Sequence, residues 1–342
     1  MAKRVTIQHL ADELNTTPST VSRALRDHPS ISVGMKKRVR DLAILRNYQV
    51  NSIAANLRSG QSKTIGVIVP RINRDFFSNV IAGIEEVANK QGYGVVICQT
   101  HDELKQEANC IEALLRARVD CILISISLET RGFEHFKKVI DMNVPLVFFD
   151  RVQESSKTIR IVNNDEKGAF VAVNHLIEQG YKRIAHFTGP GYINIYRNRK
   201  EGYLKALKEN DIPIDKNLII ENKLDYQAGY DGMRQVMKLS NPPDALFSSS
   251  DYAALGAINW LKDNNYKIPN DFGLVGYSNE KFTSHISPSL TTLDQHSLEM
   301  GKYAANVFFD RFKSEDRDFI LNSLSINPKL IIRESSKRKR KV

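Results

Sequence analysis

The 342-residue sequence predicts a small all-α domain followed by a larger α/β domain with two doubly wound parallel-sheet lobes. Apolar residues recur at helical spacing in three short segments between residues 6 and 47. From residue 64 onwards, buried-strand runs alternate with amphipathic segments of helical length. The charge changes at the same place, because residues 1–60 contain ten Lys and Arg against four acids, a net +6, whereas the whole chain carries +10.

The first two predicted helices are short and lie between residues 6 and 25, separated by a tight turn. Thr6 is a candidate N-cap for the first helix, and Thr17 is a candidate N-cap for the second. Pro18 suits the first helical position, where a missing N–H costs nothing. The apolar stripe of the first helix consists of Ile7, Leu10, Ala11 and Leu14. Together these signals predict a helix-turn-helix domain.

The second helix combines an apolar side with a polar surface suited to a DNA major groove. Its apolar side consists of Val21, Ala24 and Leu25. Ser19 and Thr20 place hydroxyl groups in the first turn, and Arg23 follows one turn later. Hydroxyl and guanidinium groups on a short helix are the groups that contact base edges. We therefore expect this helix to recognise DNA.

A third helix is predicted over residues 32–47, after a turn that contains His28. Ser32 is its candidate N-cap. Its inward stripe consists of Met35, Val39, Leu42 and Ala43. Its outward basic residues are Lys36, Lys37, Arg38 and Arg40. A basic head on a nearly neutral body is typical of a domain that binds phosphates.

The segment from residue 47 to residue 63 contains helix formers but few apolar residues. Ile53, Ala54 and Leu57 would share one face of a helix. One interpretation is a segment that becomes ordered only against a partner, with Leu57 inserted into a minor groove. The other is a plain tether between domains. Both interpretations remain open on composition alone.

Strands and helices alternate in two similar halves from residue 64 to residue 278, which predicts two lobes with a cleft between them. In such sheets, ligands bind at the carboxyl ends of the strands. We therefore expect ligand contacts from residues that follow the strands. These candidates are Pro70, Arg71, Asn73, Phe76, Phe77, Asp150, Arg151, Asp251, Ser278 and Asn279.

No motif for catalysis, metal or cofactor binding is present. The chain lacks GxGxxG after a strand, GxxxxGK[ST], HExxH and GxSxG, so we expect neither an enzyme nor a bound cofactor or metal. Cys98, Cys110 and Cys121 have no CxxC spacing and lie in or beside apolar runs, which predicts buried free thiols. No apolar run is long enough for a signal peptide or a membrane span, so we expect a cytoplasmic protein that does not contact membranes.

Several motifs together resemble the LacI/GalR transcription regulators, from about Val5 to about Ile332. They include VTIQHLADELNTTPSTVSRAL, the later NY, TIGVIVP, FFSNVIAGIEEVANKQGY, NNDEKGAFVAVNHLIEQGYKRIAHFTGP, RKEGYLKAL, SSDYAALGA and KIPNDFGLVGYSN. The resemblance implies a homodimer with a periplasmic-binding-protein-like effector domain. Each head would read half of a pseudo-palindromic operator in double-stranded DNA, and the hinges would open its central minor groove.

The resemblance also implies which residues of the head and hinge contact DNA. Pro18 occupies a position where several relatives have a base-reading side chain, so Ser19 and Arg23 carry more of the readout. Val50 stands where the family usually has proline, which implies a less rigid entry to the hinge. The expected DNA contacts are Thr6, Thr17, Pro18, Ser19, Thr20, Arg23, His28, Tyr48, Asn51, Ala54 and Leu57.

For the cleft, the resemblance implies that Phe77 stacks on the effector and that Arg199 contacts it. Because Phe76 and Phe77 are adjacent, we expect one in the core and one in the cleft. The family often has two aspartates where this chain has Ser278 and Asn279, which makes a sugar effector less secure. The expected effector contacts are Asn73, Phe76, Phe77, Asp150, Arg199, Asp251 and Ser278.

These expectations define three segments: a DNA-binding domain over 1–48, a hinge over 49–62, and an effector-binding and dimerisation domain over 63–342. The predicted function is a transcription regulator whose operator affinity changes with a small-molecule effector, such as a sugar, a sugar derivative or a purine-like compound. The alternative is a sugar-binding protein without a DNA role. The basic end SSKRKRKV matches a nuclear signal pattern, but a solvated polybasic end is the simpler interpretation.

Overall fold

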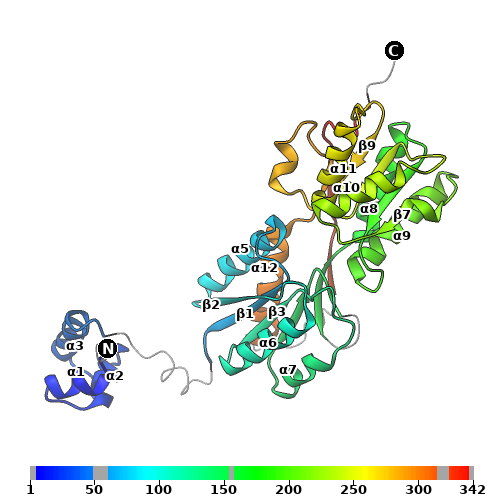
Figure 1. Cartoon of the computed structure of the whole chain (residues 1–342). Helices are drawn as coiled ribbons and strands as arrows, with labels where there is room; N and C mark the ends of the chain where they lie inside the picture. Colours follow the sequence, from blue (N-terminus) through cyan, green and yellow to red (C-terminus); the bar gives the residue numbers. More distant parts are fainter. Residues whose placement is uncertain (1–4, 49–60, 154–157, 314–322, 339–342) are drawn as a thin grey trace. The chain divides into compact units, whose positions relative to one another are not determined.

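The computed structural model describes residues 5–48, 61–153, 158–313 and 323–338 (Figure 1). Contacts divide the chain into two compact units, residues 1–62 and residues 63–342. Each unit is described by itself. The predicted hinge residues Asn51, Ala54 and Leu57 lie outside the described residues, as does Val50.

The first unit contains three helices around one small core. They are α1 (Ile7–Glu13), α2 (Pro18–Leu25) and α3 (Val33–Leu45). The core combines the three predicted apolar stripes, with Leu10, Val21 and Val39 completely buried at its centre. All three predicted N-caps are confirmed, since the hydroxyls of Thr6, Thr17 and Ser32 each accept a main-chain N–H of the first helical turn.

The first lobe of the second unit is a parallel six-stranded sheet with the strand order β11-β5-β4-β3-β1-β2. The strands are β1 (Thr64–Val69), β2 (Gly94–Gln99), β3 (Cys121–Ile124), β4 (Leu146–Phe149), β5 (Ile159–Asn163) and β11 (Ser323–Ile326). Its helices are α5 (Asp75–Lys90), α6 (Leu104–Arg116), η1 (Glu134–Phe136), α7 (Lys137–Asp141), α12 (Ser297–Phe308) and η4 (Phe309–Lys313). Val67 and Val69 pack with the helices on one face, and Ile68 packs on the other.

The second lobe has a parallel four-stranded sheet with the order β7-β6-β8-β9. Its strands are β6 (Ile184–Thr188), β7 (Ile219–Glu221), β8 (Ala245–Ser248) and β9 (Gly273–Val275). Its helices are α8 (Asp165–Glu178), α9 (Asn194–Glu209), η2 (Lys216–Leu218), α10 (Tyr226–Val236), α11 (Asp251–Asp263) and η3 (Lys281–Ser284). α8 packs on α9, and α10 packs on α11, so a helix pair covers each face. A small antiparallel pair, β10 (Thr292–Asp294) and β12 (Lys329–Ile331), joins this lobe.

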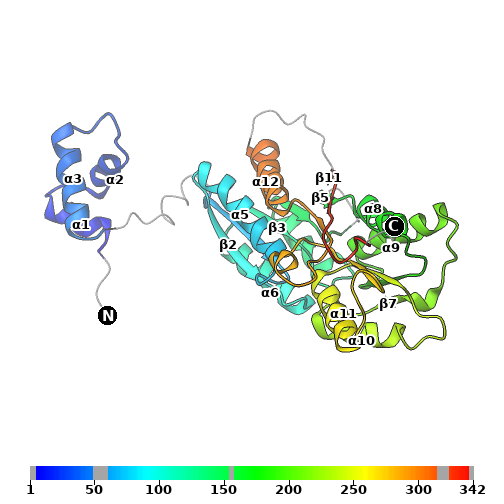
Figure 2. The ribbon, with the colours of Figure 1, turned by 90° about the horizontal axis from the view of Figure 1, so that it is seen from above.

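The last part of the chain returns to the first lobe, which the simple division into two consecutive halves did not predict. α12 lies beside α5, and β11 pairs with β5 (Figure 2). A Cβ atom on Gly83 of α5 would collide with the carbonyl oxygen of Leu298, and one on Gly301 of α12 would collide with that of Val80. The two helices therefore need glycine to approach this closely. The chain crosses between the lobes more than once, and these crossings bring distant segments to the cleft.

Candidate DNA-recognition helix and effector cavity

The polar groups of α2 divide into capping groups and free groups. The hydroxyl of Thr17 accepts the main-chain N–H of Thr20 at 3.2 Å and lies 3.0 Å from the Thr20 hydroxyl. Ser19 and Arg23 are exposed on the same helix. The Ser19 hydroxyl lies 3.5 Å from that of Thr17, at the outer limit of a hydrogen bond. The capping contacts define the start of α2, and Arg23 remains for contacts outside the chain.

Other predicted DNA contacts in the head have intramolecular roles. Thr6 forms a capping box with His9, in which each side chain accepts the main-chain N–H of the other residue. The His28 ring nitrogen Nδ1 lies 2.8 Å from the Ser30 hydroxyl. Tyr48 is half-buried against the core of the head. The structural roles of Thr6, which caps α1, and of Tyr48, which packs on the core, do not require a contact with DNA.

Several cations of the head are paired with acids, and Arg23 is not among them. Arg46 lies 2.7 Å from Glu13, and Asp27 receives both Lys36 at 3.2 Å and Arg40 at 2.9 Å. Within residues 5–48, no acidic side chain pairs with Arg23. Its guanidinium therefore keeps its full hydrogen-bonding capacity for a partner molecule.

A cavity of about 490 Å³ lies between the two lobes of the second unit. Six of the seven expected effector contacts line it, namely Phe76, Phe77, Asp150, Arg199, Asp251 and Ser278. The strand-end candidates Arg71 and Arg151 line it as well. Asn73 is exposed in the turn before α5 and is not among the lining residues, whereas its neighbours Arg71 and Arg74 are. The turn therefore contributes two arginines to the cavity wall. Asn73, which we expected to contact the effector, does not line the cavity.

The two adjacent phenylalanines correct the expectation that one lies in the core and the other in the cleft. Phe76 and Phe77 are both buried, both belong to the core beneath α5, and both line the cavity. Their rings meet edge to face, with centroids 5.1 Å apart. Because the first turn of α5 lies at the cavity floor, both rings serve as its apolar surface.

Arg199 is held in the wall of the cavity by several partners at once. Its side chain is only 3% exposed, and its Nε lies 2.8 Å from a carboxylate oxygen of Asp165. It also donates to the carbonyl oxygen of Ser249 and to Oε1 of Gln295, and it stacks 3.6 Å from the ring centroid of Tyr277. This ion pair is therefore buried in the cavity wall and does not lie at the protein surface.

Asp251 lines the cavity, but both of its carboxylate oxygens are used within the protein. Oδ1 accepts the Thr292 hydroxyl at 2.7 Å, and Oδ2 accepts the main-chain N–H of Glu280 at 2.9 Å. These bonds hold the loop after β9 against β10. Asp251 thus positions neighbouring cavity residues, including Glu280, which the sequence did not single out.

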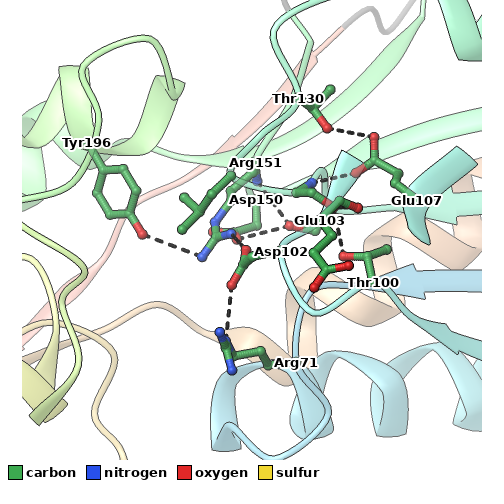
Figure 3. A network of polar contacts seen from close by, with 12 residues as sticks. Arg71, Thr100, Asp102, Glu103, Glu107, Thr130, Asp150, Arg151 and Tyr196 are labelled. Carbon is green, nitrogen blue, oxygen red and sulfur yellow. Dashed lines mark hydrogen bonds and ion pairs between the residues drawn. The ribbon is translucent and has the colours of Figure 1, made fainter. Parts of the chain in front are cut away.

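The wall formed by the first lobe carries a charged network that Figure 3 shows in detail. Arg71 Nε lies 3.1 Å from one oxygen of Asp102, and Arg151 Nη1 lies 2.6 Å from the other. Arg151 also approaches the Tyr196 hydroxyl of the second lobe at 3.4 Å, and the hydroxyl of Ser125 donates to Asp150. Asp102 follows β2, so the strand-end rule that found Arg71 and Arg151 applies to it as well.

A second buried network supports the loop that follows β3. Glu107 is fully buried and accepts from the Thr130 hydroxyl at 2.8 Å (Figure 3). It also accepts from the main-chain N–H of Ser127 and from the His135 ring at 2.7 Å. In the same loop, the carbonyl oxygen of Leu128 accepts the Tyr192 hydroxyl across the cleft at 2.8 Å. The network fixes one rim of the cavity.

Burial raises the pKa values of three carboxyl groups at the cavity. It raises the pKa of Glu280 to about 7 and the pKa values of Asp150 and Asp251 to about 6. The folded protein therefore retains protons that the unfolded chain releases. The stability that these protonated groups contribute is greatest at low pH and is lost as pH rises through about 6 and 7.

This linkage predicts that the melting temperature of the wild type changes less favourably from pH 6.5 to pH 8 than that of a Glu280→Gln variant. His186, whose pKa burial lowers to about 4, and Cys98, whose pKa a hydrogen bond with Cys110 lowers to about 7, act in the opposite direction, but both are present in the two proteins. The change should be about 2 °C more negative in the wild type, measured by circular dichroism at constant ionic strength. Equal changes in the wild type and the variant would contradict the assignment.

Within the described residues, no group of three or more His, Cys, Asp or Glu side chains could hold a metal ion. The three cysteines are free, but only Cys121 is fully buried, while Cys98 and Cys110 are half-buried. None of the helices in this part of the chain is both long enough and apolar enough to cross a membrane.

Comparisons with known proteins agree with the fold. The profile of a periplasmic-binding-protein-like domain matches residues 173–336. The HTH-type transcriptional repressor PurR of Actinobacillus pleuropneumoniae serotype 3 is 30% identical over 331 residues, which cover 96% of this chain and 98% of that protein. The ribose operon repressor of Haemophilus influenzae is 28% identical over 332 residues, covering 96% and 98% of the two chains.

The fold is also found among solved structures. The lac repressor dimer bound to operator and the anti-inducer ONPF superimposes with a TM-score of 0.86 at 24% identity, over 98% of this chain and 99% of that chain. The cellobiose complex of the transcriptional regulator CelR gives a TM-score of 0.73 at 23% identity, over 97% and 100%. At these identities, the structures show that the fold is shared.

Proposed function

This chain belongs to the LacI/GalR family of transcription regulators, and on that premise we propose that it binds a pseudo-palindromic operator as a homodimer. Its relatives are transcriptional repressors, so the chain is a DNA-binding regulator with an effector-binding domain. In our proposal, a small molecule in the cavity between the lobes shifts the balance between two lobe arrangements. Operator affinity changes because the heads fit the operator differently in the two arrangements.

The observation that carries the DNA-binding part of the proposal is the exposed, unpaired Arg23 on α2. An arginine can bind guanine through two hydrogen bonds, which discriminate against other bases by about 1–3 kcal/mol. Ser19 lies exposed earlier on the same helix. Arg46, Lys36 and Arg40 are already paired with acids, so they contribute mainly to the fold of the head and its electrostatic field.

The cavity supports the effector part of the proposal. It combines an apolar floor, formed by Phe76 and Phe77, with hydroxyl, carboxylate and guanidinium groups from both lobes. A pocket with this composition suits a small polar molecule such as a sugar or a related metabolite. A thermal-shift screen of sugars, sugar acids, sugar phosphates and purines would identify the class, because a ligand that binds only the folded state raises its melting temperature.

The homodimer is supported by the edge of the first sheet. β2 is an edge strand, and Val96 and Ile97 on it are 42% and 46% exposed. Exposed apolar residues on a sheet edge are typical of a surface that packs against another chain. We propose the segments 1–48, 49–62 and 63–342 as head, hinge and effector domain. We place the protein in the cytoplasm, where it would reach its DNA.

The alternative, a sugar-binding protein without a DNA role, would share the two lobes but would not need the head. Its test is a selection from a pool of random DNA duplexes at about 0.15 M salt, where nonspecific phosphate contacts are weakened. We expect enrichment of an inverted repeat with half-sites about one helical turn apart. If the selected pool shows no sequence preference, the proposal is wrong, and the basic head binds phosphates only.

A further inference from the structure

Glu280 places a carboxylate in the cavity with one oxygen unused. It is 3% exposed and lines the cavity between the lobes. Its Oε2 accepts the main-chain N–H of Asp75 across the cleft at 3.1 Å, and its own N–H donates to Asp251. Its Oε1 has no hydrogen-bond partner among the described residues and is not sealed from the cavity. The carboxylate is thus fixed from two sides and presents a free acceptor to a ligand.

Neither of the other two polar residues of this loop, Ser278 and Asn279, offers an acidic acceptor to the cavity. Asn279 donates to Asp294 at 3.3 Å and accepts from Arg333 at 2.8 Å, and it does not line the cavity. The Ser278 hydroxyl lines the cavity and accepts from Gln295 at 3.0 Å. The acidic acceptor that the loop offers the cavity therefore comes from position 280, one residue beyond the Ser278–Asn279 pair.

The charges of the cavity wall disfavour an anionic ligand. Its acids are Asp102, Glu103, Glu129, Asp150, Asp225, Asp251 and Glu280. Its arginines and lysine are Arg71, Arg74, Arg151, Arg199 and Lys223. Seven acids against five bases leave an excess of two acids, and Arg71, Arg151 and Arg199 already bind carboxylates. Among the described residues, the cavity cations without an ion pair are Arg74, which stacks on the ring of Tyr252, and Lys223, which is exposed to solvent. A ligand carboxylate or phosphate placed against the buried arginines would have to displace the carboxylates that they already bind.

We propose that Glu280 is a specificity-determining residue that accepts a hydrogen bond from a hydroxyl group of an uncharged polyhydroxyl effector and excludes acidic analogues. The inference rests on the proposed function of the cavity as the effector site. A hydrogen bond to an ionised group contributes more than one between neutral groups. A ligand that lacks the donor leaves the buried carboxylate unsatisfied, which is why such a site discriminates strongly.

Glu280 also makes the affinity depend on pH, because only its ionised form is a strong acceptor. Its carboxyl has a pKa of about 7, raised mainly by burial and further by nearby acids. The charged groups around it are Arg74 just before α5, Asp75 of α5, Asp251 of α11, the adjacent Lys281, and Arg333 after β12. Affinity for an uncharged polyhydroxyl ligand should therefore rise roughly tenfold from pH 6 to pH 8.

The experiment uses the full chain with D-ribose, D-glucose and D-galactose as uncharged probes and D-glucuronate as the acidic probe. Affinities are measured by isothermal titration calorimetry at pH 6, 7 and 8. We expect at least one uncharged probe to bind more tightly at pH 8, and D-glucuronate to bind at least tenfold more weakly than D-glucose. Glu280→Gln should lower the affinity for the probe that binds by about 10–100-fold and remove the pH dependence of that affinity.

Three controls separate this role from a structural one. Glutamine retains an acceptor for the Asp75 N–H, so the unliganded melting temperature of Glu280→Gln at pH 6.5 should stay close to that of the wild type. Glu209→Gln, at an exposed position near the end of α9, should leave both affinity and pH dependence unchanged. His101→Asn should retain the pH dependence, which excludes the histidine that lines the cavity.

Three results would overturn the inference. They are tighter binding of D-glucuronate than of the uncharged probes, unchanged affinity and pH dependence in Glu280→Gln, and no binding of any uncharged probe. DNA selection with the unliganded protein tests the proposed function separately. A protein that selects an inverted repeat but binds none of these sugars would contradict the ligand class and leave the regulator intact.

Discussion

Replacing Arg23 with alanine is expected to remove most of the sequence preference of the protein for its selected duplex. The side chain is exposed on α2, and no acid in the described part of the head competes for it. Loss of a bidentate contact to guanine costs about 1–3 kcal/mol in each half-site. A symmetric site contains two such contacts, so we expect affinity to fall at least tenfold, measured by fluorescence anisotropy with the selected duplex and a scrambled one.

The matched control is Lys37→Ala, which removes an exposed cation from α3. A phosphate contact carries no sequence information, so this variant should bind both duplexes more weakly by a similar factor. The slope of log affinity against log salt concentration should fall by about one for each lost contact. If Arg23→Ala keeps its preference for the selected duplex within a factor of two, Arg23 does not read a base.

The head was predictable from sequence because its structure depends on short-range patterns. Thr6, Thr17 and Ser32 cap the three helices, and each cap is recognisable from the residue type and the apolar spacing that follows it. The apolar stripes then determine which faces meet. Local patterns also predicted the alternating strands and helices of the second unit, because parallel strands that are buried on both faces have continuous apolar runs.

The cavity was predictable only in part, because residues from several loops line it. The rule that ligand contacts follow strands found Arg71, Asp150 and Arg151. It did not indicate Glu280, which lies beyond the first residues after β9, or Gln295, which follows the short antiparallel strand β10 that the alternating pattern did not predict. No local pattern marks such residues. Their role depends on which partners the tertiary structure places around them.

The position of a residue in the wall also did not reveal which of its atoms are already used. Asp251 was predicted as an effector contact, and it does line the cavity, but Thr292 and Glu280 occupy both of its carboxylate oxygens. Sequence patterns indicate where polar groups lie, but only the tertiary structure shows which of their atoms already have hydrogen-bond partners. Function at the cavity is therefore best assigned to groups with unused capacity, such as Oε1 of Glu280.

Arg199→Met is expected to lower the free energy of unfolding of the second unit by about 3–5 kcal/mol. Arg199 and Asp165 have side chains that are 3% and 1% exposed, and they form a direct ion pair at 2.8 Å. Removing one partner of a buried pair leaves the other charge uncompensated. The melting temperature should fall by roughly 10 °C, followed by circular dichroism. The double variant Arg199→Met/Asp165→Asn should lose less than the sum of the two single variants.

The pH dependence of the loss separates the ion pair from simple loss of packing. Burial already raises the pKa of Asp165, and Arg199 opposes that effect. Without Arg199 the pKa of this carboxyl rises further, so ionising it in the folded state costs more free energy as pH increases. An acid whose pKa is raised on folding destabilises the protein above its unfolded pKa. The penalty of Arg199→Met should therefore be larger at pH 8 than at pH 5, whereas a penalty independent of pH would indicate lost packing alone.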